Sequence, residues 1–256
     1  MREKYALVTG ASSGIGYQYC QELLLLGWTI IGVARNVAPL EKLKEKYPSQ
    51  VITFSYDLSI QDNVYDLFRS VNKYRISLLI NNAGFANYGS YNKVNIDADL
   101  NLIDLNIKTV LLLTKLFLEK FTKENIIGRV LNVGSLVSFT PSPFLSSYAA
   151  SKAYVLNYSV ALNTELKKQK SLNRVICICP GVLTTNFWKR ANFKKPTKKM
   201  IGEMSVEKFA HKSLRQSLKT NRKNYIIIGL ANKILWFLIK IAPQKWSTNI
   251  MYKIFR

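Results

Sequence analysis

Short apolar runs alternate along the chain with longer segments in which apolar residues recur at helical spacing. The runs that predict buried strands are residues 5–9, 28–34, 51–56, 76–80, 128–134, 174–179 and 225–228. Helical spacing follows the first run to about residue 26, and returns at about residues 39–47, 96–121, 147–169 and 205–218. This alternation predicts one α/β domain built on seven strands, mostly parallel.

Composition supports a single folded unit. The chain has 256 residues, of which 48% are hydrophobic, and no repeat or low-complexity linker interrupts it. We expect residues 1–230 to form one domain. Residues 231–256 are expected to form an amphipathic helical tail that packs on this domain, on a partner or on a membrane.

A glycine-rich turn follows the first predicted strand. Gly10, Gly14 and Gly16 lie between this strand and a helix, where glycines allow a sharp turn and close approach of a ligand. The helix behind them presents free N–H groups to a phosphate, which favours a dinucleotide site over a chance turn. The residues assigned to this cradle are Gly10, Ser12, Ser13, Gly14, Ile15 and Gly16.

The second predicted strand ends at Arg35 and Asn36 instead of the acidic residue that usually binds a ribose 2′-hydroxyl. A guanidinium can hold a 2′-phosphate, and no carboxylate is present there to repel it. This favours NADP(H) over NAD(H). The alternative is that Arg35 is an ordinary surface arginine.

Two further strand ends carry polar residues. Asp57 could meet the adenine or cap the next helix, and the two uses are compatible. The motif Asn81-Asn82-Ala83-Gly84 could lock neighbouring strands and border a ribose, or it could be a plain turn. The residues assigned here to the nucleotide site are Asp57, Leu58, Asn81, Ala83 and Gly84.

Tyr148 and Lys152 lie four residues apart on a predicted helix, so both project from one face. A cation held there should lower the tyrosine pKa and make the phenol a usable acid or base. Taken alone, this pattern is weak and would indicate a helix-surface pair. Ser135 ends the fifth strand, and Asn106 interrupts a long apolar helix, where it could bond backbone or hold a water.

In order along the chain, these motifs resemble the short-chain dehydrogenase/reductase family over about residues 4–230. The matching residues are Thr9-Gly10-x-x-x-Gly14-x-Gly16, Asp57, Asn81-Asn82-Ala83-Gly84, Asn106, Ser135, Tyr148-x-x-x-Lys152 and Pro180-Gly181 with Thr185. The resemblance implies a Rossmann-type, doubly wound sheet with helices on both faces. It also implies hydride transfer to or from a nicotinamide.

The resemblance assigns a role to each catalytic residue. Tyr148 is implied to be the general acid/base, and Lys152 to lower its pKa while binding the ribose hydroxyls. Ser135 is implied to hydrogen-bond the substrate oxygen. Asn106 would hold a water in the proton relay.

The resemblance also concerns the cofactor. Pro180 and Gly181 belong to the implied cofactor site, and Thr185 would meet the nicotinamide carboxamide or the phosphates. A basic residue at Arg35 accompanies NADP preference in this family. The second basic marker, just before the middle glycine, is absent because Ser13 occupies that position.

Charge is unevenly distributed. The net charge is +22, and residues 189–256 hold 17 Lys and Arg against Glu203 and Glu207, a net +15. Such a field suits an anionic ligand, an anionic membrane surface or adventitious nucleic acid, although no nucleic-acid recognition motif appears. The alternative is a solvated basic face.

The tail places Trp246, Ile250, Met251, Ile254 and Phe255 at helical spacing among basic residues. Such a segment could lie on an anionic membrane, cover a substrate pocket or form a dimer interface. The segment resembles the apolar-basic tail of some bacterial members of the family, and this resemblance implies a lipophilic carbonyl or alcohol substrate in each case. A homo-oligomer, either dimer or tetramer, is also expected.

Cys20, Cys177 and Cys179 provide no disulfide framework or metal site, and are expected to be small core side chains. The N-terminus has no secretory pattern, and the apolar run at residues 234–242 is broken by Lys240. We therefore expect a cytoplasmic protein with a peripheral membrane contact through the tail as an alternative.

Two classes of function remain. The favoured one is an NADPH-dependent carbonyl reductase or alcohol dehydrogenase. The other is a non-catalytic NADP(H)-binding sensor or interaction protein, which an incomplete set of Ser135, Tyr148 and Lys152 would have favoured. Residues 186–204 predict a long functional loop beside the site, and His211 predicts a helix-surface residue.

Overall fold

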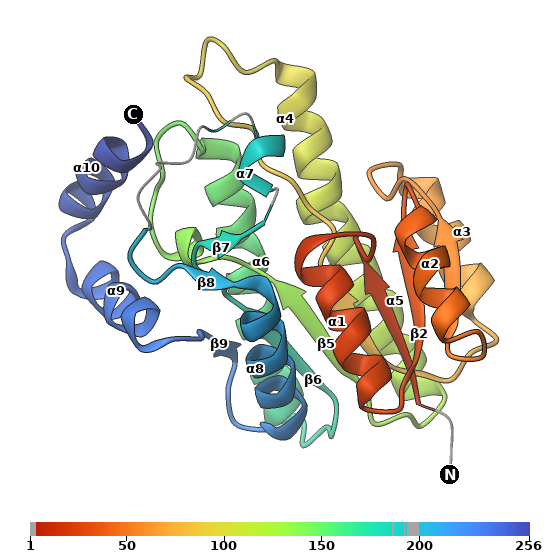
Figure 1. Cartoon of the computed structure of the whole chain (residues 1–256). Coiled ribbons are helices and arrows are strands. Elements are labelled where there is room, and N and C mark those ends of the chain that lie inside the picture. The colour runs from red at the N-terminus through yellow and green to blue at the C-terminus, as the bar shows by residue number, and fades with distance from the viewer. Residues whose placement is uncertain (1–3, 186, 192, 194–199) are drawn as a thin grey trace.

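A computed structural model describes residues 4–185, 187–191, 193 and 200–256 (Figure 1). Seven strands form one sheet in the order β3-β2-β1-β4-β5-β6-β9, and every neighbouring pair is parallel. The strands are β1 (Tyr5–Thr9), β2 (Thr29–Ala34), β3 (Val51–Ser55), β4 (Ile76–Asn81), β5 (Arg129–Val133), β6 (Arg174–Ile178) and β9 (Tyr225–Ile226). The seven predicted strands are confirmed.

Helices bury both faces of this sheet. On one face lie α1 (Gly14–Leu25), α2 (Ala38–Lys46) and α8 (Val206–Lys219), and on the other lie α3 (Gln61–Val71), α5 (Thr109–Lys123) and α6 (Ser146–Lys168). Neighbouring residues of β1 divide between the two cores: Ala6 and Val8 pack on the first face, and Leu7 on the second. Strands buried on both faces must be apolar throughout, which explains the continuous apolar runs in the sequence.

The predicted helix over residues 96–121 is not continuous. It consists of α4 (Ile96–Ile103), a π-helical turn η1 (Asp104–Lys108) and α5. Asn106 lies in the middle of η1 and is fully buried. π-Helical turns are rare and are frequently found at functional sites.

The described part of residues 186–204, which the sequence predicts to be a long loop, contains a short helix, α7 (Phe187–Arg190), and the start of β8 (Met204–Ser205). Strand β8 pairs in parallel with β7 (Leu183–Thr184). Asn186, Asn192 and residues 194–199 lie outside the described residues. A short helical turn, η2 (Leu136–Phe139), follows β5.

The tail forms two helices, α9 (Leu230–Ile241) and α10 (Gln244–Phe255), which meet at Pro243. In Figure 1 they lie at the outer edge of the molecule, away from the strands at its centre. Proline lacks the N–H that an α-helix needs, which explains the break. No helix among the described residues is long and apolar enough to cross a membrane.

Candidate active site

A cavity of about 1340 Å³ opens at the carboxyl ends of the central strands. Strands β2 and β4 flank β1 on opposite sides, so the strand order reverses at β1. Open α/β sheets bind ligands in the crevice that such a reversal creates. Thr9, at the end of β1, holds this edge together. Its hydroxyl accepts hydrogen bonds from the backbone N–H groups of Asn82 and Ala83, each at 3.0 Å.

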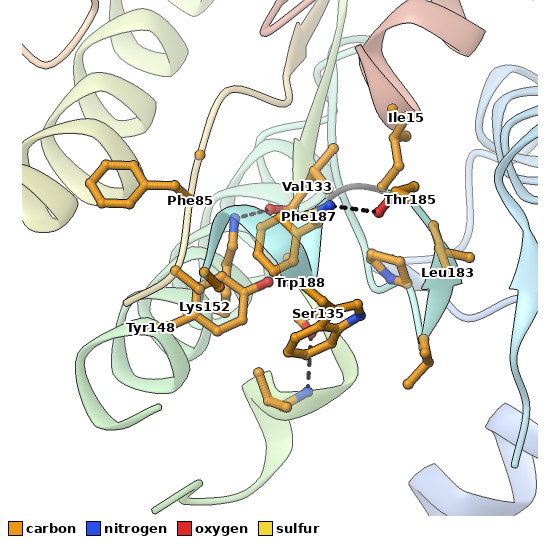
Figure 2. A pocket seen from close by; sticks show the side chains of 18 of the residues that line it. Ile15, Phe85, Val133, Ser135, Tyr148, Lys152, Leu183, Thr185, Phe187 and Trp188 are labelled. Atoms are coloured by element: carbon orange, nitrogen blue, oxygen red, sulfur yellow. Dashed lines mark hydrogen bonds between the residues drawn. The ribbon is translucent and has the colours of Figure 1, made fainter. Parts of the chain in front are cut away.

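Ser135, Tyr148 and Lys152 come together in this cavity (Figure 2). Ser135 follows β5 and caps η2, where its Oγ accepts the N–H of Val137 at 3.3 Å. Tyr148 and Lys152 project from one face of α6, as the four-residue spacing predicts. The Lys152 Nζ lies 5.7 Å from the centre of the Tyr148 ring.

Burial governs the pKa of both groups on α6. It raises the pKa of Tyr148 to about 12, and a hydrogen bond with Ser135 acts in the opposite direction. It also lowers the pKa of Lys152 to about 8. The Lys152 ammonium donates to the Val133 carbonyl at 2.8 Å. The expected lowering of the tyrosine pKa is therefore wrong for this arrangement, because desolvation of the phenol outweighs its polar contacts.

Asn106 lies outside the cavity and holds residues around it in place through hydrogen bonds. Its Nδ2 donates to the Phe85 carbonyl at 3.0 Å and to the Ser151 hydroxyl at 3.1 Å, and its Oδ1 accepts the Phe85 N–H at 3.2 Å. Asn106 does not line the cavity. Of the two uses that the sequence leaves open, bonding to backbone is the one that these contacts show. A Cβ at Gly84 would lie 2.9 Å from the Asn106 Oδ1, so a larger residue would displace this amide.

The glycine loop has the form of a phosphate cradle. Gly10 and Gly14 adopt φ of +62° and +55°, a region that favours glycine. A Cβ at Gly10 would come within 2.9 Å of the Ala83 Cα. The first turn of α1, which begins at this loop, contains no acidic residue, so its N–H groups and dipole favour an anion. The loop therefore fits the pyrophosphate of a dinucleotide.

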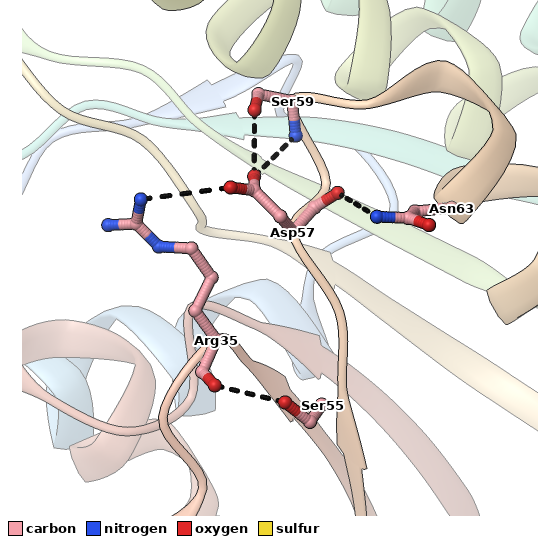
Figure 3. Close-up of polar contacts among 5 residues, drawn as sticks. All are labelled: Arg35, Ser55, Asp57, Ser59 and Asn63. Atoms are coloured by element: carbon pink, nitrogen blue, oxygen red, sulfur yellow. Dashed lines mark hydrogen bonds and ion pairs between the residues drawn. The ribbon is translucent and has the colours of Figure 1, made fainter.

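Arg35 and Asp57 form an ion pair at the edge of the cavity, with 3.9 Å between Nη1 and Oδ2 (Figure 3). The Arg35 side chain is 75% exposed and so remains accessible to a ligand. Asp57 also accepts the Ser59 N–H at 3.0 Å and the Ser59 hydroxyl at 2.7 Å. Partial burial raises the pKa of Asp57, but these hydrogen bonds and the Arg35 charge outweigh it and leave the pKa below its ordinary value.

Two residues assigned to the cofactor do not line the cavity. The Asn81 side chain points into the core, where its Nδ2 donates to Asn132 Oδ1 at 2.9 Å and to Thr114 Oγ1 at 3.2 Å. Asn82 lines the cavity in its place. Gly16 lies inside the first turn of α1, where a Cβ would collide with the Gly10 carbonyl. Asn81 and Gly16 thus hold the frame of the site.

The other predicted residues line one continuous cavity. They are Gly10, Ser12, Ser13, Gly14, Ile15, Arg35, Asp57, Leu58, Ala83, Gly84, Ser135, Tyr148, Lys152, Pro180, Gly181 and Thr185. Two expectations for residues outside the site are confirmed. Cys177 and Cys179 are buried core side chains, with 3.7 Å between their sulfurs. His211 lies on the surface beside Glu22.

Sequence reasoning missed Arg190 and Asn232. The Arg190 Nη2 donates to the Ser13 Oγ at 3.1 Å, which brings a guanidinium to the glycine loop. Asn232 comes from α9, lines the cavity, and donates to the carbonyls of Ile228 and Gly202 at 3.0 and 3.1 Å. Its Oδ1 is buried without a partner. The basic loop was the only signal for Arg190, and none pointed to Asn232.

Apolar side chains enclose the part of the cavity beside Tyr148. Phe187 of α7 lies with its ring centre 5.5 Å from that of Tyr148, and Trp188 is its neighbour in Figure 2. Phe255 of α10 packs on Trp188, and the Tyr88 hydroxyl donates to the Phe255 carbonyl at 2.6 Å. The tail is thus part of the cavity wall, as the pocket-covering alternative predicts.

Comparison with known proteins agrees with this geometry. Residues 4–196 match the family model for short chain dehydrogenases. A very-long-chain 3-oxoacyl-CoA reductase of Mus musculus is 30% identical over 253 residues, which cover 93% of this chain and 78% of the mouse protein. An NADPH-dependent 3-dehydrocapnine reductase of Ornithobacterium rhinotracheale is 32% identical over 195 residues, covering 73% of this chain and 68% of that protein.

The fold has solved counterparts. A short-chain dehydrogenase from Sphingobium yanoikuyae in complex with NADPH superimposes with a TM-score of 0.81 at 27% identity, covering 95% of this chain and 94% of that one. The all-parallel sheet, the glycine cradle and the Ser135, Tyr148 and Lys152 cluster are consistent with that match. The chain therefore belongs to the short-chain dehydrogenase/reductase family, oxidoreductases of Rossmann-type fold that act on CH–OH or carbonyl groups.

Proposed function

We propose that this protein is an NADPH-dependent reductase of lipophilic ketones or aldehydes. The observation that carries the proposal is the placement of Ser135, Tyr148 and Lys152 in one cavity with the glycine cradle. NADPH supplies a hydride when bound. The reverse oxidation of an alcohol would use the same residues.

In this mechanism the phenol of Tyr148 donates its proton to the carbonyl oxygen of the substrate as negative charge develops there. A pKa of about 12 keeps this phenol protonated at neutral pH, as an acid requires. The Ser135 hydroxyl donates a second hydrogen bond to the same oxygen. Lys152 holds the ribose hydroxyls and places a positive charge below the Tyr148 ring. Asn106 fixes Phe85 and Ser151 around them, and its Oδ1 can accept one further hydrogen bond, from a water in the proton relay.

Two arginines support the preference for NADPH. Arg35 reaches the cavity from the end of β2, and Arg190 reaches it from α7. Arg190 contacts Ser13, which stands where NADP-preferring relatives carry their second basic residue. We infer that Arg190 supplies this missing charge from another part of the chain. Two similar proteins are described as NADPH-dependent or NADPH-bound, which supports the same preference.

The cavity supports a lipophilic substrate. Its volume of about 1340 Å³ exceeds the roughly 300–1,000 Å³ of ordinary ligand pockets, which leaves room for a substrate beside the dinucleotide. Aromatic and aliphatic side chains of α7, α9 and α10 form the wall near Tyr148. The similar mouse protein is described as a reductase of very-long-chain acyl substrates. No observation among the described residues favours the non-catalytic alternative.

Substitution of the proposed acid tests the assignment. Tyr148→Phe should lower kcat for ketone reduction by at least about a thousandfold, since the proton donor is lost, and leave NADPH binding within about twofold. Tyr154→Phe on the same helix is the matched control, because Tyr154 packs on Tyr158 away from the cavity. NADPH oxidation over a panel of ketones and cofactor fluorescence measure the two effects. A fully active Tyr148→Phe enzyme would rule out the proposed mechanism.

A further inference from the structure

The tail has an apolar surface that does not face the cavity. Leu230, Ile234, Phe237 and Ile241 recur on α9 at spacings of four, three and four residues, and Trp246 follows at the start of α10. All five are more than half exposed and none of them lines the cavity. We call these five residues the outer face.

The outer face is unusual for this molecule. The described part of the chain exposes 19 large hydrophobic side chains, and ten of them lie in residues 230–256. Isolated exposed apolar residues need no explanation, but a concentration of this kind marks an interaction site. Exposure of this apolar surface to water is unfavourable, so we expect another surface to cover the outer face in the functional protein.

Charge indicates what covers it. Lys233 and Lys240 on α9, and Lys245 and Lys253 on α10, are exposed around the outer face. Residues 208–256 contain eleven Lys and Arg and no acidic residue. A second copy of this chain would bring an equally basic tail against the first, whereas an anionic lipid surface attracts it. Exposed Trp and Lys beside an apolar stripe are typical of helices that lie in a membrane interface.

An adjacent stripe of the same helices lines the cavity. Leu235, Leu238 and Ile239 of α9, and Ile250 and Ile254 of α10, belong to its wall. Four of these five side chains are also exposed, which places them at an opening of the cavity to the surface. The buried amide of Asn232 fixes α9 to the carbonyls of Gly202 and of Ile228, which follows β9. The tail is therefore anchored to the site that it covers.

We propose that the outer face docks on an anionic membrane, and that the lipophilic carbonyl substrate enters from the bilayer through the opening between α9 and α10. The docking part is independent of the reaction, and the entry part rests on the proposed function. Apolar burial and lysine–headgroup attraction act together, so binding weakens as salt increases.

Vesicle flotation of the full chain tests the docking. Vesicles of equal parts phosphatidylcholine and phosphatidylglycerol should bind the protein, and pure phosphatidylcholine should bind it much less. Phe237→Asn with Trp246→Asn should lower the partition coefficient at least about tenfold, because two large apolar side chains leave the interface. Leu172→Asn is the matched control, since Leu172 is 64% exposed outside the tail.

Each result decides the proposal. Binding that is absent, or equal in the double variant and in Leu172→Asn, overturns the docking. A wild-type dimer in light scattering that the double variant converts to monomer, with no vesicle binding, identifies a second copy as the true occupant and overturns it as well.

Turnover separates the docking from the entry. The double variant should reduce a short water-soluble ketone normally and a long-chain ketone dissolved in anionic vesicles at least about tenfold more slowly. Equal rates on the vesicle substrate overturn the entry route. A wild-type enzyme that reduces no ketone of either kind contradicts the proposed function and the entry route, while flotation still decides the docking.

Discussion

Burial sets the chemistry of single residues in this site. The Tyr148 phenol and the Lys152 ammonium lie on one face of α6, and desolvation shifts their pKa values in opposite directions, to about 12 and about 8. The tyrosine stays protonated across the physiological range. The lysine is the group whose charge changes at moderately alkaline pH.

The pH profile of reduction should follow Lys152. Its ammonium is charged below a pKa of about 8 and neutral above it. If that charge supports catalysis, kcat is constant at lower pH and falls as pH rises through about 8. Turnover of a short ketone at saturating NADPH, from about pH 6 to about pH 10, measures this. Lys152→Arg keeps a positive charge and should flatten the fall in whatever activity remains. A wild-type profile without a fall shows that the ammonium is not required.

Cofactor preference should depend on Arg190. Arg190→Ala should raise the KM for NADPH about tenfold and change the KM for NADH by less than about twofold, since only NADPH carries the 2′-phosphate. Arg215→Ala, an exposed arginine on α8, is the control. Equal losses for the two cofactors would show that Arg190 contacts another part of the nucleotide.

Among single residues, the sequence could predict those whose positions follow from local spacing. The glycine loop and the Tyr148–Lys152 pair are of this kind. Arg190 reaches Ser13 across 177 positions of the chain, so no local pattern shows the contact. The choice between Asn81 and Asn82 was wrong for a related reason. Neighbouring residues at a strand end point to opposite sides, and only the packed core decides which side faces the ligand.

At the scale of elements, buried strands were the most predictable. Their apolar runs are long, and the residues that follow them ended at the cavity as expected. Helix interruptions were less visible. Nothing in the apolar pattern of residues 96–121 indicates the π-helical turn η1. Contacts with distant residues stabilise this turn, among them the hydrogen bonds of Asn106 with Phe85 and Ser151. Pro243, which divides the tail, is by contrast readable from sequence.

Helix α4 should take part in self-association. Ile96, Leu100 and Ile103 form an exposed stripe on it, at spacings of four and three residues. Replacing Leu100 by Lys should place a charge in this face and shift the expected dimer or tetramer toward monomer. Light scattering after gel filtration measures the mass, with Leu25→Lys on α1 as the exposed control. A monomeric wild-type protein would contradict the prediction.

At the scale of the whole molecule, the cavity joins residues from Gly10 to Phe255. The α/β core contributes the glycine loop and the strand ends, and the tail completes the cavity wall at the opposite end of the sequence. Composition predicted that the tail is basic and apolar. It could not show that α9 turns one stripe toward the cavity and another toward solvent, because that depends on where Asn232 anchors the helix.

The π-helical turn has one more consequence. Each residue of an α-helix advances the chain by about 100° around its axis, so one extra residue in a turn changes the phase of the two flanking helices by that angle. Helix α5 is fixed against the sheet by Leu113, Phe117 and Phe121. The extra residue therefore changes the rotation of α4 about its axis and leaves α5 in place. A deletion of one residue from Asp104–Lys108 would leave the sheet in place and rotate the stripe at Leu100 by about a quarter of a turn. The same inserted residue thus sets the direction of both the Asn106 side chain and the exposed stripe of α4, for which self-association is predicted.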